Sequence, residues 1–377
     1  MRQSSLNHTS AEASEGLSGL LRGFHIDGPL LLGLLTLSGL GLVVLYSASN
    51  ANMELVNRQI IRLGVGYTVM IAVAQIHPAL LRAWTPWIFG IGIALLVAVL
   101  AVGEMGKGAQ RWLDLGFVRF QPSEAMKLAV PMMVAWYLSD KPLPPERLRL
   151  IVAGLIMVVP TLLIAKQPDL GTALLVGAAG AFALFMAGLR QRVIFALTVV
   201  GAACLPLLWY VMREYQRQRV RTFLNPENDP LGAGYHIIQS KIAIGSGGLY
   251  GKGWLNGTQS QLDFIPERST DFIFAVFAEE FGLMGIALLL VLYFFIVVRG
   301  VYISTQGQET FTRLLGGALS LTFFIYMFVN IGMVTGLLPV VGVPLPLVSY
   351  GGTSMVTLMA GFGMLMSIHT HRRLLAF

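Results

Sequence analysis

Carboxylates at the seam between a polar segment and a long apolar one are the first residues of this sequence that could perform chemistry. The stretch QLDFIPERSTDFIFAVFAEE (261–280) closes the longest polar segment and opens an apolar run that continues to Val298. Asp271 stands where that run begins, and Glu279 and Glu280 lie inside it. Charges at a membrane boundary or within a spanning helix are costly, so each needs a reason. The two glutamates either pair with a basic residue of another helix or line a polar cavity.

Asp271 is the leading candidate for a catalytic residue. A carboxylate just before an apolar helix can also cap free backbone N–H groups, and position alone favours neither role. The neighbouring Glu267 and Arg268, and the basic segment upstream of them, favour catalysis. A carboxylate that stays ionised beside cations can take a proton from a hydroxyl group that acts as a nucleophile.

The composition excludes a soluble globular protein. Of the 377 residues, 55% are hydrophobic and 12% are charged, whereas about 25% charged residues are usual. The mean hydropathy is +0.70, so the chain is expected to cross a membrane several times. In such a chain the net charge of +7 reflects topology and anionic lipids, and no nucleic-acid partner is expected. The single cysteine, Cys204, excludes an intrachain disulfide and a cysteine-based metal site.

Ten apolar stretches approach the about 20 residues that a membrane-spanning helix requires. They are residues 30–49, 60–76, 84–102, 124–138, 150–165, 171–188, 193–211, 271–298, 313–335 and 353–369. The sequence therefore predicts an all-α polytopic integral membrane protein with about ten transmembrane helices. Residues 29–377 form this transmembrane domain, with a large extracytoplasmic loop at 212–270 between helices 7 and 8. Residues 1–28 are interpreted as a mobile cytoplasmic N-terminal tail and not as a cleaved signal.

Both termini are expected on one side of the membrane because the number of spans is even. Lys and Arg occur in every loop on that side, although they are not more numerous there. The opposite side concentrates its cations in two segments, 107–127 and 213–268. Because long loops are translocated largely regardless of charge, we expect both termini in the cytoplasm and the protein in the cytoplasmic (inner) membrane. The outer cations then become a functional clue.

The outer segments could bind an anion. Arg213, Arg217 and Arg221 recur at four-residue steps on one helix face, which could lie on phospholipid headgroups, form an anion-binding wall, or do both. The glycine-rich stretch 226–259 could cradle phosphate oxygens with backbone N–H groups. The segment PVVGVPLPLVSYGGTS (339–354) is expected to be re-entrant or extended against the same site.

Two acid–base pairs accompany these segments. Glu124 and Lys127 share a helix face at a spacing of three residues, so they could neutralise each other locally or serve the site. Lys166 and Asp169 form the second pair, at an outer helix end. The candidate substrate-binding residues are Arg111, Arg119, Glu124, Lys127, Lys166, Asp169, Arg219, Lys241, Lys252, Arg268 and Ser349.

These residues suit a lipid-linked phosphate or pyrophosphate as substrate. The lipid would stay in the membrane, the phosphates would meet Lys and Arg, and a hydroxyl group would meet the base. No His-x-x-His or paired-carboxylate metal signature is present, and His236 stands alone in the outer loop, so no dedicated metal site is expected. A divalent cation, Mg²⁺ or Mn²⁺, could still share the stabilisation of a pyrophosphate leaving group, and turnover in chelator would test this.

Four motifs resemble the family of shape, elongation, division and sporulation (SEDS) proteins. They are RWLDLGFVRFQPSEAMK (111–127), KQPDLGT (166–172), PERSTDFIFAVFAEEFG (266–282) and PLPLVSYGG (344–352). The match covers nearly the whole chain beyond residue 28, and its RWLDLG and PER forms are similar to the elongation branch of the family. The resemblance implies a ten-helix peptidoglycan glycosyltransferase that polymerises lipid II at the outer face of the cytoplasmic membrane. It also implies a class B penicillin-binding transpeptidase and other elongation-complex membrane proteins as partners.

The resemblance also implies roles for particular residues. The family's essential acid falls on Asp271, and its buried helix pair falls on Glu124 and Lys127. Many members carry His where this chain has Ser269. Either Asp271 acts alone or through water here, or that position is not catalytic, which is the simpler interpretation.

The expected reaction is an inverting glycosyl transfer. Asp271 takes the proton from the GlcNAc 4-hydroxyl of an acceptor lipid II, and the oxygen attacks C1 of the MurNAc at the reducing end of a growing strand. Undecaprenyl pyrophosphate departs, and preset cations stabilise its charge. These cations are drawn from Arg111, Arg119, Lys127, Arg219, Lys241, Lys252 and Arg268. A lipid II flippase and a non-catalytic scaffold that activates the transpeptidase are the competing hypotheses. The charges gather on one face, not at the midplane, which argues against a carrier.

Overall fold

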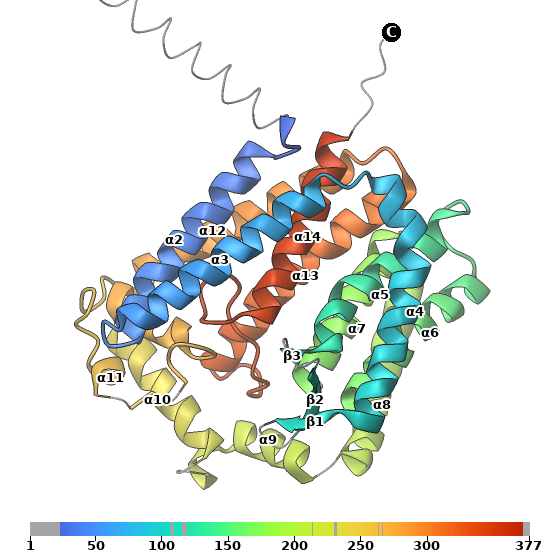
Figure 1. Ribbon diagram of the computed structural model, residues 1–377. Coiled ribbons are helices and arrows are strands. Elements are labelled where there is room, and N and C mark those ends of the chain that lie inside the picture. Colours follow the sequence, from blue (N-terminus) through green and yellow to red (C-terminus); the bar gives the residue numbers. More distant parts are fainter. Residues whose placement is uncertain are drawn as a thin grey trace, which may run out of the picture.

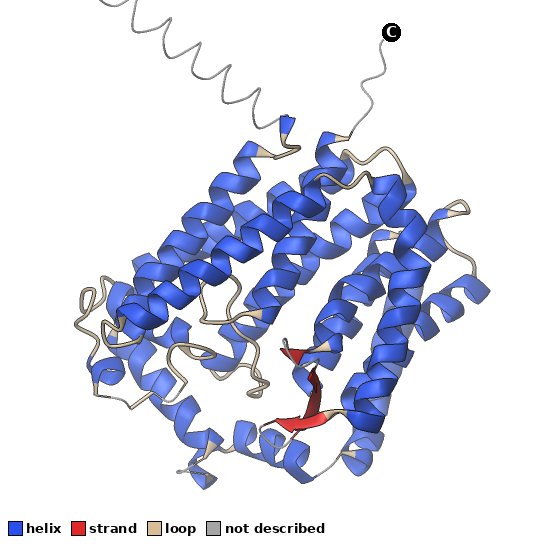
Figure 2. Cartoon of the chain, viewed as in Figure 1, coloured by secondary structure: helices blue, strands red, loops and turns tan. Residues whose placement is uncertain are grey.

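The computed structural model describes residues 23–106, 109–114, 119–212, 214–229, 232–262, 264–265 and 267–371. Most of the expected N-terminal tail, and Arg213, therefore lie outside the described residues. The described part is nearly all helical (Figure 2).

Each of the ten apolar stretches coincides with a helix. The helices are α2 (Gly28–Ala48), α3 (Met53–Ala74), α4 (Pro78–Val102), α5 (Pro122–Ser139), α6 (Arg147–Lys166), α7 (Leu170–Met186), α8 (Gln191–Val211), α12 (Ile273–Thr305), α13 (Thr310–Val334) and α14 (Thr353–Thr370). By length and composition, α2, α4, α6, α12 and α13 are clear candidate membrane spans, and α7 is a shorter apolar helix.

The helices form a bundle with two distinct ends. In Figure 1, the start of α2 and the end of α14 lie at one end, and the short strands and helices of the long connections lie at the opposite end. We call these the terminal end and the loop end. Helices α2, α3, α12 and α14 are packed together, and α13 joins them to α5 and α7 of the second group.

Two connections contain more regular structure than the sequence predicts. The 103–121 connection forms a small antiparallel sheet of β1 (Glu104–Gly106), β2 (Ala109–Asp114) and β3 (Arg119–Phe120). The 212–270 segment contains α9 (Glu214–Leu224), the short η1 (Pro226–Asn228), α10 (Ala233–Ser246) and α11 (Thr258–Gln261). Much of the glycine-rich stretch expected to be a phosphate-cradling loop is therefore helix α10, which buries Ile237, Ser240 and Ala243.

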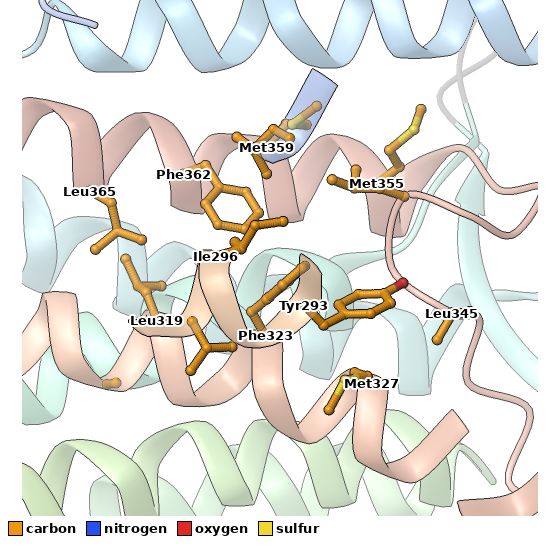
Figure 3. Packing of buried hydrophobic residues seen from close by; sticks show 14 of the residues in the cluster. Tyr293, Ile296, Leu319, Phe323, Met327, Leu345, Met355, Met359, Phe362 and Leu365 are labelled. Atoms are coloured by element: carbon orange, nitrogen blue, oxygen red, sulfur yellow. The ribbon is translucent and has the colours of Figure 1, made fainter. Parts of the chain in front are cut away.

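The core between α12, α13 and α14 holds the last connection in place. The rings of Tyr293, Phe323 and Phe362 are packed together, with centroids 5.6 Å and 5.0 Å apart for successive pairs (Figure 3). Tyr293 is fully buried, and its hydroxyl donates to the carbonyl of Pro346 at 2.6 Å. The segment between α13 and α14 is non-helical and buries Leu345 and its neighbours, as its prolines predict.

Helix α12 contains a break that brings the 247–253 loop against it. Gly282 has φ 61° and ψ −163°, and a Cβ there would lie 2.3 Å from the backbone nitrogen of Gly251. The loop replaces the lost helical hydrogen bonds: Lys252 N donates to the Glu279 carbonyl, and Leu283 N donates to the Gly248 carbonyl. Only glycine combines this φ with so close an approach.

Candidate active site

A cavity of about 380 Å³ at the loop end brings together six of the predicted site residues. They are Arg111, Glu124, Lys127, Asp169, Arg219 and Asp271. These residues come from β2, α5, the turn before α7, α9 and the turn before α12. Three acids and three bases that are far apart in the sequence therefore face one space.

The backbone at Asp271 is held by side chains from two other segments. The side-chain amide of Asn330 donates to the Asp271 carbonyl at 2.9 Å and to the Val343 carbonyl at 2.7 Å. The Ser349 hydroxyl donates to the neighbouring Thr270 carbonyl at 2.6 Å. The N-cap position of α12 is Phe272, so the Asp271 side chain is not at the capping position. This geometry argues against a capping role for Asp271.

Glu124 and Lys127 form a buried ion pair in the cavity wall. Lys127 Nζ lies 2.6 Å from Glu124 Oε1, and both side chains are less than a tenth exposed. The Lys127 ammonium also lies 5.0 Å from the centre of the Tyr326 ring. Glu124 is in the first turn of α5, where the helix dipole favours a negative charge. The pair therefore neutralises its own burial and also faces the cavity.

Arg111 and Asp169 form a second pair in the wall. Arg111 Nε is 3.9 Å from Asp169 Oδ2, and another of its guanidinium nitrogens donates to the Pro168 carbonyl. Asp169 caps α7 by accepting from Thr172 N at 3.2 Å, and Gln121 donates to it at 3.0 Å. Asp169 is thus fixed by α7 and Gln121, and it lies beside Arg111.

The hydroxyl oxygens of Tyr326 and Ser354 in this wall are buried and lack a hydrogen-bond partner among the described residues, and so do two buried atoms of charged side chains. The latter two are Arg111 Nε, a donor, and Glu124 Oε2, an acceptor. Buried polar groups in folded proteins are nearly always paired, so unpaired ones need an explanation. A polar ligand in the cavity would supply such partners.

The other predicted residues lie outside this cavity. Lys252 Nζ pairs with Glu279 at 2.8 Å, and Arg268 donates to the Ser260 carbonyl. Lys166 is exposed at the end of α6, and Lys241 is exposed on α10 beside Gly336. Ser349 is buried and acts on the backbone next to Asp271, as described above. Arg119 lies in β3, but its side chain lies outside the described residues.

The two glutamates of α12 are buried and do not line this cavity. Glu279 is fully buried and accepts from Lys252, Thr258 and the backbone of Gln259 and Ser260. Glu280 accepts from the Ser47 hydroxyl on α2. The pairing alternative of the sequence analysis therefore holds for Glu279, and its partner comes from a loop and not from another helix.

Residues outside the predicted set complete the site. Gln121, Tyr326 and Ser354 line the cavity, and Asn330 fixes the Asp271 backbone. An asparagine within the apolar stretch 313–335 is a sequence signal for a structural or functional contact, because a polar side chain in a membrane span usually has a partner. Tyr326 carries no such signal, since tyrosine is common in apolar helices.

Comparisons with known proteins agree with this arrangement. Residues 29–374 match the model of the cell cycle protein family FtsW/RodA/SpoVE. The chain is 56% identical over 353 residues to the peptidoglycan glycosyltransferase MrdB of Escherichia coli K12, covering 93% of this chain and 95% of that one. It also resembles the crystal structure of the rod shape determining protein RodA of Thermus thermophilus, with a TM-score of 0.69 and 28% identity over 91% of this chain and 96% of that one.

A further solved structure shows such a chain in an assembly. It is described as a peptidoglycan synthase complex that coordinates polymerization and crosslinking, and the matched chain has a TM-score of 0.79 at 33% identity. The match covers 91% of this chain and 97% of that one. Together with the apolar helices, these likenesses confirm the membership that the four motifs predict: this chain is a multi-pass membrane protein of the FtsW/RodA/SpoVE family.

Proposed function

We propose that Asp271 is the general base of this chain, which is a peptidoglycan glycosyltransferase that polymerises lipid II into β-1,4-linked glycan strands. The observation that carries the proposal is the cavity in which Asp271 lies with Arg111, Lys127 and Arg219. A base and several cations around one space suit a reaction that needs a deprotonated hydroxyl and a charged leaving group.

The proposed step forms one bond and breaks one. The Asp271 carboxylate takes the proton of the GlcNAc 4-hydroxyl of the acceptor, and the oxygen attacks C1 of the donor MurNAc from the face opposite the pyrophosphate. The new C1–O4 bond forms as the bond between C1 and the phosphate oxygen breaks, with inversion at C1. The electron pair of that bond leaves with undecaprenyl pyrophosphate, and Asp271 later returns its proton to water.

The cations of the cavity are assigned to the pyrophosphate. Lys127 is hydrogen-bonded to Glu124, and Arg111 donates to the Pro168 carbonyl beside Asp169, so their positions are fixed before the substrate arrives. Such preorganised charge is usually the largest catalytic contribution. Arg219 reaches the cavity from α9 and completes the group. In this proposal the cations outside the cavity contact other parts of the substrate or stabilise the fold. They are Lys166, Lys241, Lys252 and Arg268.

We further propose how the protein sits in the membrane. The ten long helices all span the bilayer, the terminal end is cytoplasmic, and the loop end with its 212–270 segment faces outward in the inner membrane. In this orientation the cavity meets lipid II on the outer face. A class B penicillin-binding transpeptidase is the proposed partner, together with other membrane proteins of the elongation complex, in keeping with the synthase complex that contains a similar chain.

Polymerisation of fluorescent lipid II tests the proposal. The purified protein with its transpeptidase partner is expected to make glycan strands that a gel resolves, and Asp271→Asn is expected to make none while still folding and binding the partner. If wild type and Asp271→Asn both make glycan strands, the protein is a transferase but Asp271 is not its base. Labelled lipid II that crosses sealed vesicles without being polymerised would instead support a carrier.

Turnover in excess chelator shows whether basic side chains or a divalent ion stabilise the leaving group. Among the described residues no group of three His, Cys, Asp or Glu is placed to hold a metal. We therefore assign the leaving-group charge to the arginines and Lys127, and expect turnover to persist in excess chelator. Activity that falls in chelator and returns with Mg²⁺ or Mn²⁺ would add a divalent cation to the site.

A further inference from the structure

A second charged pocket lies at the terminal end, far from the candidate active site. It has a volume of about 610 Å³ and lies between the α5–α6 connection and the α7–α8 connection. Arg147, Arg190 and Arg192 line it, and Glu146 is the acid among its lining residues. The excess of arginine makes it a site for an anion.

The three arginines are not engaged in ion pairs with other described residues. The pairs at this end use other cations, such as Arg82 with Asp140 and Arg299 with Asp27. Helices α6 and α8 both begin at this pocket, and the Glu146 side chain does not cap α6. The positive ends of two helix dipoles therefore add to the charge of the arginines.

The walls of the pocket and the helices that leave it are apolar. Leu148, Leu150, Leu189 and Val193 share the lining with the arginines. Along α6, a stripe of large exposed side chains continues from the pocket toward the loop end: Leu148, Ile151, Leu155, Val159 and Leu162. On α8, Phe195 is 72% exposed, one turn beyond the pocket.

Helix α8 lacks a close packing partner in the described part of the chain. It makes no extensive contact with any other helix, whereas α6 is packed against α5 and α7. An apolar helix inside a membrane must be covered by protein or by lipid. The apolar flank of α8 is therefore left for acyl chains, at the point where the arginines are available for a headgroup.

We propose that this pocket binds an anionic phospholipid, with the headgroup phosphate on Arg147, Arg190 and Arg192 and the acyl chains along α6 and α8. Basic pockets between transmembrane helices are a recurrent way of holding acidic lipid headgroups. The bound lipid fills the space beside α8 and so fixes this helix, which leads to α9 and hence to Arg219 of the cavity.

Native mass spectrometry of the full chain in detergent tests this directly. Phosphatidylglycerol and phosphatidylcholine with identical acyl chains are titrated against wild type, Arg190→Gln, the triple variant R147Q/R190Q/R192Q, and Lys141→Gln. Lys141 is an exposed cation in the same connection that does not line the pocket, so it is the matched control. Thermal unfolding without added lipid checks that all four are folded.

The expected result is a first phosphatidylglycerol that binds wild type more tightly than phosphatidylcholine. Each arginine near the headgroup contributes roughly five-fold in affinity, so Arg190→Gln loses about that factor and the triple variant loses the preference. Lys141→Gln keeps it. Equal losses in Arg190→Gln and Lys141→Gln would reduce the effect to a diffuse positive field and overturn the site. Glycerol phosphate that displaces the lipid at equal concentration would also overturn it, because the acyl chains would then contribute nothing.

Discussion

Two carboxylates at the start of α12, Asp271 and Glu279, have opposite surroundings. Glu279 is fully buried, and its oxygens accept from Lys252, Thr258 and two backbone N–H groups. Asp271 is partly exposed and faces a cavity, with its backbone and not its carboxylate held by Asn330. Depth of burial therefore does not mark the reactive acid. An acid whose surroundings leave room for a substrate is the one that can react.

The Glu124–Lys127 pair lies between these extremes, because it is both buried and in the cavity wall. Lys127→Met should lower the free energy of unfolding by about 3–5 kcal/mol, since it leaves an uncompensated buried carboxylate. Glu124→Leu combined with Lys127→Met should recover most of that loss but remain inactive. Unfolding followed by fluorescence in detergent, with lipid II polymerisation, measures both. A stable and active double variant would restrict the pair to a structural role.

Glu279→Gln should separate the role of Glu279 from that of Asp271. The substitution removes the charge that Lys252 and four further donors share, and hydrogen bonds to charged groups contribute about 1.5–3 kcal/mol each. We expect a loss of about 3 kcal/mol in unfolding free energy, with turnover per folded molecule close to wild type. Asp271→Asn, measured alongside, should unfold like wild type. An inactive but fully stable Glu279→Gln protein would remove the contrast between the two residues.

Arg219 and Arg221 on α9 allow the same contrast for cations. Arg219 lines the cavity, whereas Arg221 pairs with Glu214 on the surface at 2.7 Å. Arg219→Gln should lower kcat by about 10–100-fold, somewhat less than the loss of one oxyanion-hole donor, because two other cations remain. Arg221→Gln should change it little, since exposed pairs contribute about 0–1 kcal/mol. Similar losses in both variants would point to the position of α9 rather than to the cavity.

The smallest expected effect is at the terminal end, where Asp27 begins α2. Burial raises the pKa of Asp27, but hydrogen bonds from Arg299 and from Leu30 N, together with the charges of Arg299 and His369, outweigh burial and lower it. A lowered pKa gives stability that is present above the unfolded pKa of about 3.9 and lost as the pH falls through the folded value. Asp27→Asn should therefore make the free energy of unfolding depend less on pH in the acid range. Polymerisation at neutral pH should not change. An unchanged pH dependence of the unfolding free energy in the acid range would contradict this.

The sequence predicts the scaffold well because each long helix carries its own apolar signal. Long apolar stretches are helices in the structure, and the extended segment before α14 follows from its prolines. The cavity was predictable in part: Asp271, Glu124 and Lys127 stood out as charges that a membrane does not tolerate without a reason.

The remainder depends on contacts between distant segments. Lys252 and Arg219 are equivalent in the sequence as cations of one loop, yet the first meets Glu279 and the second reaches the cavity. That difference arises because the 247–253 loop packs at the break of α12, which only the Gly282 conformation permits. Tyr326 could not be predicted from the sequence either, since its contribution depends on the Lys127 ammonium that lies over its ring.

The central claim is that Asp271 performs chemistry while the cations bind the substrate. The most direct measurement compares lipid II affinity and single-turnover rate for wild type and Asp271→Asn. Loss of a general base should lower the rate by about 10²–10⁴-fold and leave the affinity within a few-fold of wild type. An affinity that collapses while the rate at saturating lipid II stays near wild type would make Asp271 a binding residue and contradict the account.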